Sequence, residues 1–200
     1  AVALAILGPR LPTFAGAPAD SGVPLPPTTP TPMPPLAIRA YTATTALGRG
    51  RVAQLDALRA RRGGLRRNDF GREADRLDTW IGRVDGLEDA ALPESFTQWE
   101  CRNNRLAWLA LQQDGMFEAV REARERLGAT RVAIVVGTST SSIGATEDAY
   151  VRLENGEFPA DLQRSIVHTP HSLGDFVREA TGLRGPCVTV ATACSSSAKV

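Results

Sequence analysis

The residue of this chain best suited to covalent chemistry is Cys194, in the segment LRGPCVTVATACSSSAKV at 183–200. An apolar, β-branched run at 187–190 precedes it and is typical of a short buried strand. The small residues that follow allow a tight turn from strand to helix, which would place Cys194 at a helix N-terminus. Free backbone N–H groups and the helix dipole favour a thiolate there, so Cys194 is a candidate nucleophile.

The alternative for Cys194 is a small buried structural residue, which is the usual environment of a free cysteine. Its neighbours favour the nucleophile. The motif TACSSS at 192–197 closely resembles the nucleophile motif of β-ketoacyl–acyl-carrier-protein synthases, the condensing enzymes of fatty-acid and polyketide synthesis in the thiolase-like superfamily. The resemblance implies that Cys194 opens a buried helix and carries the growing acyl chain as a thioester. It also implies a homodimer and, as partner, an acyl carrier protein bearing acyl and malonyl groups.

The resemblance extends over residues 36–200 and is strongest over 128–200. There, an apolar strand at 131–137 runs into a small-residue loop, and a helix ending at Gly182 leads to the strand before Cys194. Strands that alternate with helices indicate an α/β chain with a mostly parallel sheet. We therefore expect an incomplete first half of a thiolase-like fold.

Decarboxylation of the malonyl unit in the resembled family needs two histidines and a supporting lysine, all well downstream of the cysteine. This chain ends six residues after Cys194, and its only lysine, Lys199, is five residues after it. His168 and His171 precede the cysteine and do not match the family's histidine motifs. We therefore expect the N-terminal portion of a synthase, inactive in condensation by itself.

The spacing of His168 and His171 also raises the question of a metal pair. No cysteine or carboxylate cluster accompanies them, so a loop or helix-start role is the stronger prediction. The sequence has no GxGxxG and no GxxxxGK[ST] motif, and we expect neither a metal nor a cofactor.

Composition limits the other function classes. The formal charge of +1 suggests neither nucleic acid nor an anionic membrane as a partner, and no apolar run approaches the length of a membrane span. The three cysteines are too widely spaced for a disulfide framework, which favours a reducing, cytoplasmic compartment. A local basic cluster is either a solvated helix end or a docking site for an acidic carrier protein; it consists of Arg59, Arg61, Arg62, Arg66 and Arg67.

Two regions are expected along the chain. Residues 1–35 hold ten of the 14 prolines and are predicted to form a disordered Pro-rich extension; a signal peptide is a minor alternative, and a wrongly chosen start is another. Residues 36–200 are predicted to be the partial N-terminal half of the synthase domain. Its expected elements are a strand at 36–42, a helix at 52–62 with the apolar stripe Val52, Leu55 and Leu58, a short strand near 80–84, and helices at 97–115, 116–127, 143–153 and 172–181. Capping boxes are predicted at Thr97–Glu100 and Ser172–Asp175.

Three rival readings remain open. One is a non-catalytic binding or scaffold relative in which Cys194 is structural. Another is a cysteine hydrolase, with His168 or His171 as its base. The third, a chain-length factor, is disfavoured because those relatives lack the cysteine. Ala191 stands where many modular polyketide synthases have Asp, which favours a discrete fatty-acid or polyketide-type synthase.

Overall fold

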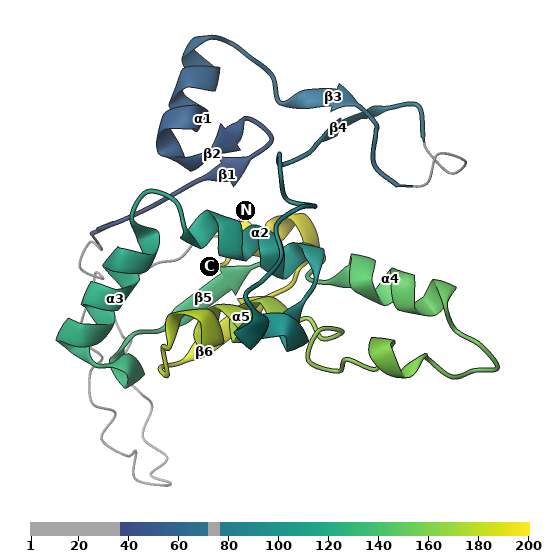
Figure 1. Cartoon of the computed structure of the whole chain (residues 1–200). Helices are drawn as coiled ribbons and strands as arrows, with labels where there is room; N and C mark the ends of the chain where they lie inside the picture. The colour runs from purple at the N-terminus through teal and green to yellow at the C-terminus, as the bar shows by residue number, and fades with distance from the viewer. Residues whose placement is uncertain (1–36, 72–76) are drawn as a thin grey trace, which may run out of the picture.

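A computed structural model describes residues 37–71 and 77–200; the Pro-rich extension predicted at 1–35 lies outside the described residues. The centre of the fold is a pair of parallel strands, β5 (Ile134–Gly137) and β6 (Cys187–Val190). Ile134 pairs with Cys187, and Gly137 pairs with Val190. In Figure 1 this pair lies within the larger body of the molecule, and residues 37–71 and 77–83 form an arm above it. The sequence predicted both strands.

Three α-helices supply most of the core around the strands: α2 (Arg102–Leu111), α3 (Met116–Leu127) and α5 (Ser172–Thr181). The ring of Phe176 on α5 is fully buried. It lies 5.9 Å from the ring of Phe96 and 6.4 Å from that of Trp99, measured between centroids. The buried apolar residues of this core are Leu92, Trp99, Ala107, Leu111, Met116, Val120, Ala123, Val132, Ile134, Val136, Leu173, Phe176, Val177 and Leu183.

Helix α3 illustrates how the sequence pattern becomes a helix. Val120 and Ala123 are buried on one face, and Phe117 and Leu127 pack beside them, as the spacing predicts. Gly128 follows at φ +89°, a left-handed conformation that glycine adopts without steric cost and that ends the helix.

Helix α5 lies close against β6 because Gly174 has no side chain. A Cβ at Gly174 would overlap the hydroxyl of Thr189 and lie 3.2 Å from the Cys187 sulfur. The strand β6 is nevertheless only half-buried, with Val188 49% exposed. The prediction of a buried strand at 187–190 was therefore right in its extent and wrong in its burial, because α5 covers one face of the pair and no described element covers the other side at Val188.

Both predicted capping boxes were wrong. Thr97 lies inside the 3-10 helix η2 (Glu94–Trp99), where its hydroxyl donates to the Glu94 carbonyl at 2.7 Å. At the start of α5, Ser172 is buried and accepts a 3.4 Å hydrogen bond from Asn104 instead of capping the helix. A local bond within η2 thus uses Thr97, and a tertiary contact uses Ser172, in place of the two predicted caps.

The remaining elements of the body are short. Helix α4 spans Ile143–Val151, close to the predicted 143–153. The other 3-10 helices are η3 (Ala129–Arg131), η4 (Ala160–Leu162) and η5 (Ala193–Ala198).

The described part of the arm, at 37–71 and 77–83, contains two antiparallel strand pairs and one helix: β1 (Thr44–Thr45) with β2 (Gly48–Arg49), α1 (Gly50–Arg59), and β3 (Leu65–Arg67) with β4 (Trp80–Gly82). The strand predicted at 36–42 was wrong, since residues 37–43 have no strand partner. The stripe on α1 is also misassigned. Val52 is 71% exposed and Leu58 66% exposed, whereas Ala57 is buried. No described element covers the face that carries the stripe.

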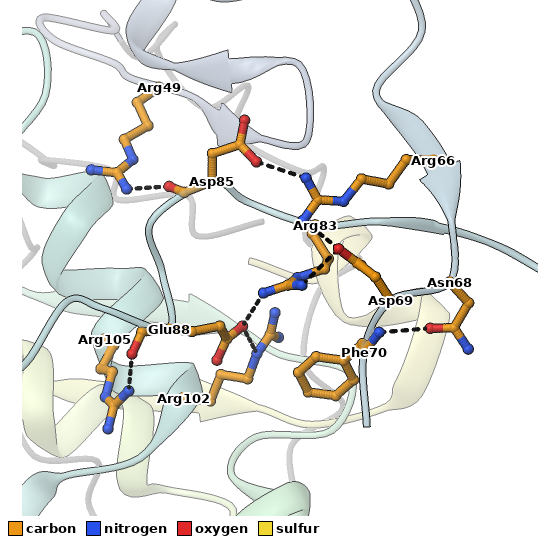
Figure 2. Close-up of polar contacts among 10 residues, drawn as sticks. All are labelled: Arg49, Arg66, Asn68, Asp69, Phe70, Arg83, Asp85, Glu88, Arg102 and Arg105. Atoms are coloured by element: carbon orange, nitrogen blue, oxygen red, sulfur yellow. Dashed lines mark hydrogen bonds and ion pairs between the residues drawn. The ribbon is translucent and has the colours of Figure 1, made fainter. Parts of the chain in front are cut away.

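An ionic network attaches the arm to the body (Figure 2). Arg83 pairs with Asp69 at 3.0 Å, and Glu88 accepts a 2.9 Å hydrogen bond from Arg102 on α2. The ring of Phe70 lies under the Arg102 guanidinium, 4.9 Å from centroid to carbon. The hydrogen bond from Arg83 and the nearby charges hold the pKa of Asp69 below its usual value, against the opposing effect of desolvation. Arg105 also takes part in this network, since its guanidinium donates to the Glu88 carbonyl at 3.1 Å.

No helix within 37–71 and 77–200 is long and apolar enough to cross a membrane.

Candidate active site

Cys194 lies just beyond the carboxyl end of β6, in a sharp turn. Ala193, immediately before it, has φ +51°, a left-handed conformation that costs a non-glycine residue about 1–2 kcal/mol. Cys194 is the second residue of η5 and is exposed. The turn therefore presents the thiol at the surface, at the end of the parallel pair.

The expected buried α-helix after Cys194 is not what forms. Residues Ala193–Ala198 make a six-residue 3-10 helix, and Ser196 is its one buried residue. No described element covers its outer face. So short a helix aligns few peptide dipoles. Cys194 is therefore a candidate nucleophile because of its exposure and its place in the turn, and not because of a helix macrodipole.

The inner side of this turn is held by Ser196. Its hydroxyl oxygen accepts a 2.8 Å hydrogen bond from the Thr192 N–H. Its proton is shared between the Thr138 and Ala193 carbonyls, both at 2.8 Å. Ser196 thereby connects Thr192 and Ala193 to Thr138, the residue that follows β5.

The small-residue loop after β5 supports the turn at Ala193. The contacts of this loop do not leave an open anion-binding nest of backbone N–H groups. The Thr138 N–H donates to Val190 at 3.0 Å, and the Thr138 hydroxyl accepts from the Ser141 N–H at 2.9 Å. Ser142 is buried and donates to the Val167 carbonyl. These contacts hold the loop in a turn between β5 and α4.

His168 lies in a loop, and His171 lies at the start of a helix. His168 has both ring nitrogens engaged, Nδ1 with the Thr146 hydroxyl and Nε2 with the Leu162 carbonyl, each at 2.9 Å. His171 is the residue before α5 and is exposed. No hydrogen bond or ion pair among the described residues joins either histidine to Cys194. Within the described ranges, no three His, Cys, Asp or Glu residues are grouped so that they could hold a metal ion.

The other two cysteines differ from Cys194 in environment. Cys101 is buried, and desolvation raises the pKa of its thiol. Cys187 is half-buried, and desolvation, together with the charge of Asp175, raises its pKa as well. Both therefore hold less thiolate at neutral pH than a solvated cysteine does.

The basic cluster divides into two parts. Arg66 pairs with Asp85 at 3.1 Å, and Arg67 lies over the Trp80 ring, 5.3 Å from its centroid. The other three are exposed and have no ion pair among the described residues: Arg59, Arg61 and Arg62. Three basic side chains are therefore exposed together at and just after the end of α1.

Comparison with known proteins identifies the family. The family model described as "Beta-ketoacyl synthase, N-terminal domain" matches residues 36–200. The chain belongs to the β-ketoacyl synthase family. Among solved structures, this synthase chain is similar to a ketosynthase (ApeO) in complex with its chain length factor (ApeC) from Xenorhabdus doucetiae. The identity is 28% and the TM-score 0.47, and the match covers 55% of this chain and 27% of that one. No curated protein matches the chain.

The family assignment confirms the resemblance read from TACSSS and the thiolase-like α/β fold class, and the N-terminal portion is the part that matches. It places the chain among condensing enzymes. The role of Cys194 stays a prediction, as do the boundaries drawn at residues 35 and 36. Sequence reasoning missed Ser196, because nothing in the run of three serines distinguishes the buried one from its exposed neighbours.

Proposed function

We propose that this β-ketoacyl synthase chain carries the acyl-enzyme of a β-ketoacyl-ACP synthase on Cys194. The observation that supports the proposal most is the exposed thiol of Cys194 in a left-handed turn at the end of β6, within the motif TACSSS. An exposed thiol at a fixed turn can meet the thioester of a carrier-bound acyl group, whereas the buried Cys101 cannot.

In the first step the Cys194 thiolate attacks the thioester carbonyl of acyl-ACP. A carbon–sulfur bond to Cys194 forms, and the bond to the carrier's thiol breaks, so that the carrier leaves as a thiolate and takes up a proton. The first N–H groups of a helix have no partner within it, and Cys194 is the second residue of η5. Its backbone N–H is thus placed to donate to the developing oxyanion.

In the second step malonyl-ACP loses carbon dioxide, and the resulting carbanion equivalent attacks the Cys194 thioester. The products are a 3-oxoacyl-ACP, carbon dioxide and free Cys194. The donors that stabilise this enolate are proposed to lie outside residues 1–200, because both ring nitrogens of His168 are already engaged and no hydrogen bond or ion pair among the described residues joins His171 to Cys194. The 200 residues alone are therefore expected to be inactive in condensation. The product would enter fatty-acid or polyketide-type synthesis.

The partner proposed for this step is an acyl carrier protein. Such carriers are acidic, and the exposed arginines Arg59, Arg61 and Arg62 would attract one electrostatically. We further propose that the protein is a homodimer located in the cytoplasm. Sedimentation of the full-length protein tests the oligomeric state, and cell fractionation tests the location.

The test is the intact mass of the full-length protein after incubation with acyl-ACP. We expect one acyl group on the wild type and on Cys187→Ala, and none on Cys194→Ala. An unmodified wild type would favour the scaffold alternative. Release of free fatty acid without any 3-oxoacyl product on addition of malonyl-ACP would favour a cysteine hydrolase. Acylation of Cys194→Ala would show that the nucleophile is a different residue.

A further inference from the structure

We propose that Ser196 is a positioning residue for Cys194, holding the strained turn before the nucleophile against the end of β5. The inference rests on the proposed function of Cys194. Ser196 is 3% exposed, whereas the other five residues of η5 are exposed. A hydroxyl that is buried within an otherwise exposed segment is retained for its hydrogen bonds, because burial without them would cost free energy.

The hydrogen bonds of Ser196 span the turn. Thr192, on one side of Ala193, donates its N–H to the Ser196 hydroxyl, and the Thr138 carbonyl accepts the hydroxyl proton, each at 2.8 Å. Thr138 is itself fixed to β6, since its N–H donates to the Val190 carbonyl at 3.0 Å. The turn is thus attached at both ends to the parallel pair.

Gly137 at the end of β5 provides a second, independent observation. A Cβ at Gly137 would lie 3.1 Å from the Ser196 carbonyl oxygen and 3.2 Å from its carbonyl carbon. These distances are shorter than ordinary van der Waals contact. The backbone of η5 therefore rests directly on β5, and a side chain at position 137 would push it away.

These contacts offset the cost of the turn. Ala193 at φ +51° is less stable than in an ordinary conformation by about 1–2 kcal/mol, so it persists only where its surroundings enforce it. Ser196 does not bond to the Cys194 thiol. Its effect on the reaction would be indirect, through the direction in which the turn aims the sulfur.

The experiment compares Ser196→Ala with Ser197→Ala in the full-length protein. Ser197 is exposed and its side chain has no hydrogen bond among the described residues, so it is the matched control. For Ser196→Ala we expect the maximal rate of acylation by acyl-ACP to fall about 10- to 100-fold, the range that small misplacement of a reacting group produces. The KM for acyl-ACP should stay unchanged. Alkylation of Cys194 by iodoacetamide, which needs no fixed thiol direction, should change less than twofold.

Gly137→Ala provides the second test, since it displaces η5 while keeping the Ser196 hydroxyl. It should reproduce the loss of maximal acylation rate. Equal acylation of Ser196→Ala and Ser197→Ala would overturn the positioning role, as would a parallel loss of alkylation and thermal stability. A wild type that is not acylated at all would overturn the proposed function itself, and the positioning proposal with it.

Discussion

The carboxylate of Asp114 accepts a hydrogen bond of 2.7 Å from the hydroxyl of Thr42, although 72 residues separate them. Asp114 also accepts from the Arg51 N–H at 2.9 Å and lies 3.6 Å from the Arg51 guanidinium. Asp114 is in the turn between α2 and α3, and Arg51 is in the first turn of α1. This one side chain therefore fixes the beginning of the arm to the body.

Substitution of Asp114 should loosen that attachment in a pH-dependent way. Desolvation raises the pKa of Asp114, but the Thr42 hydroxyl, the Arg51 N–H and the Arg51 charge outweigh it, so the net pKa is lowered from 3.8. A lowered folded-state pKa stabilises the fold above the ordinary carboxyl value, and that stability is lost as pH falls through the folded-state value. We expect Asp114→Asn to lose about 1 kcal/mol of unfolding free energy at pH 7.

The difference between wild type and Asp114→Asn should shrink below pH 3.8, where the wild-type carboxyl takes up its proton. Urea denaturation at pH 7 and pH 3 measures it. Asparagine tolerates the φ of +55° at this position, so backbone strain does not enter. Asp148→Asn, at an exposed carboxyl on α4, is the control; an equal loss there would contradict the prediction.

Two helical glycines should respond to alanine with opposite signs. At Gly174 the added methyl group meets Thr189 and Cys187, and overpacking of this kind costs about 1–3 kcal/mol. At Gly144 on α4, nothing lies within 4 Å, so alanine should stabilise by about 0.4–1 kcal/mol by restricting the unfolded chain. Thermal unfolding separates them. Thr189→Ala should rescue Gly174→Ala, and failure of that rescue would mean that another contact is responsible.

The three thiols should alkylate in a fixed order. Cys194 is exposed, Cys187 is half-buried and Cys101 is buried. Burial also raises the pKa of the latter two, which lowers their thiolate fraction at neutral pH. Peptide mapping after timed iodoacetamide treatment at pH 7 should show Cys194 modified first and Cys101 last. Modification of Cys101 before Cys194 would contradict the described packing.

The cation–π contact between Arg102 and Phe70 should be measurable as a coupling energy. A double-mutant cycle of Arg102→Gln and Phe70→Leu is expected to give about 0.5–1 kcal/mol, the range for exposed pairs. Arg67 over Trp80, in the same arm but within one hairpin, provides a comparison. Coupling near zero for Arg102 and Phe70 would mean that this contact does not contribute to the attachment of the arm.

Periodicity and composition were sufficient for the elements that form the core. The β-branched run of β5 and the spacing of Val120 and Ala123 on α3 determine burial locally, so the predictions there are confirmed. The motif around Cys194 predicted the family, which the match over 36–200 confirms.

The structure of the arm could not be predicted from local sequence patterns, and the reason is physical. Alternation at 36–42 describes a strand only if a neighbouring strand pairs with it, and residues 37–43 have no strand partner in the described chain. The stripe with Val52 and Leu58 predicts a covered helix face, and in the described chain that face is exposed. Hairpin β3–β4 instead depends on contacts of Arg83 and Phe70, which no periodicity encodes.

The candidate site also contains one residue that the local sequence predicts and one that depends on a distant part of the chain. Cys194 could be chosen from its neighbours in sequence, but the buried state of Ser196 follows from Thr138, which is 58 residues earlier. Such a pairing is set by the parallel register of β5 and β6 and not by local spacing.

That parallel register has a consequence for biosynthesis. Strand β5 cannot pair until β6 exists, and α4 and α5 must be synthesised between them. At a translation rate of about 5–20 residues per second, Ile134 and Val136 remain without their partner strand for several seconds. During that interval the nascent chain offers an unpaired apolar edge to its surroundings, so we expect its yield in cells to depend on chaperones that bind such segments on the ribosome.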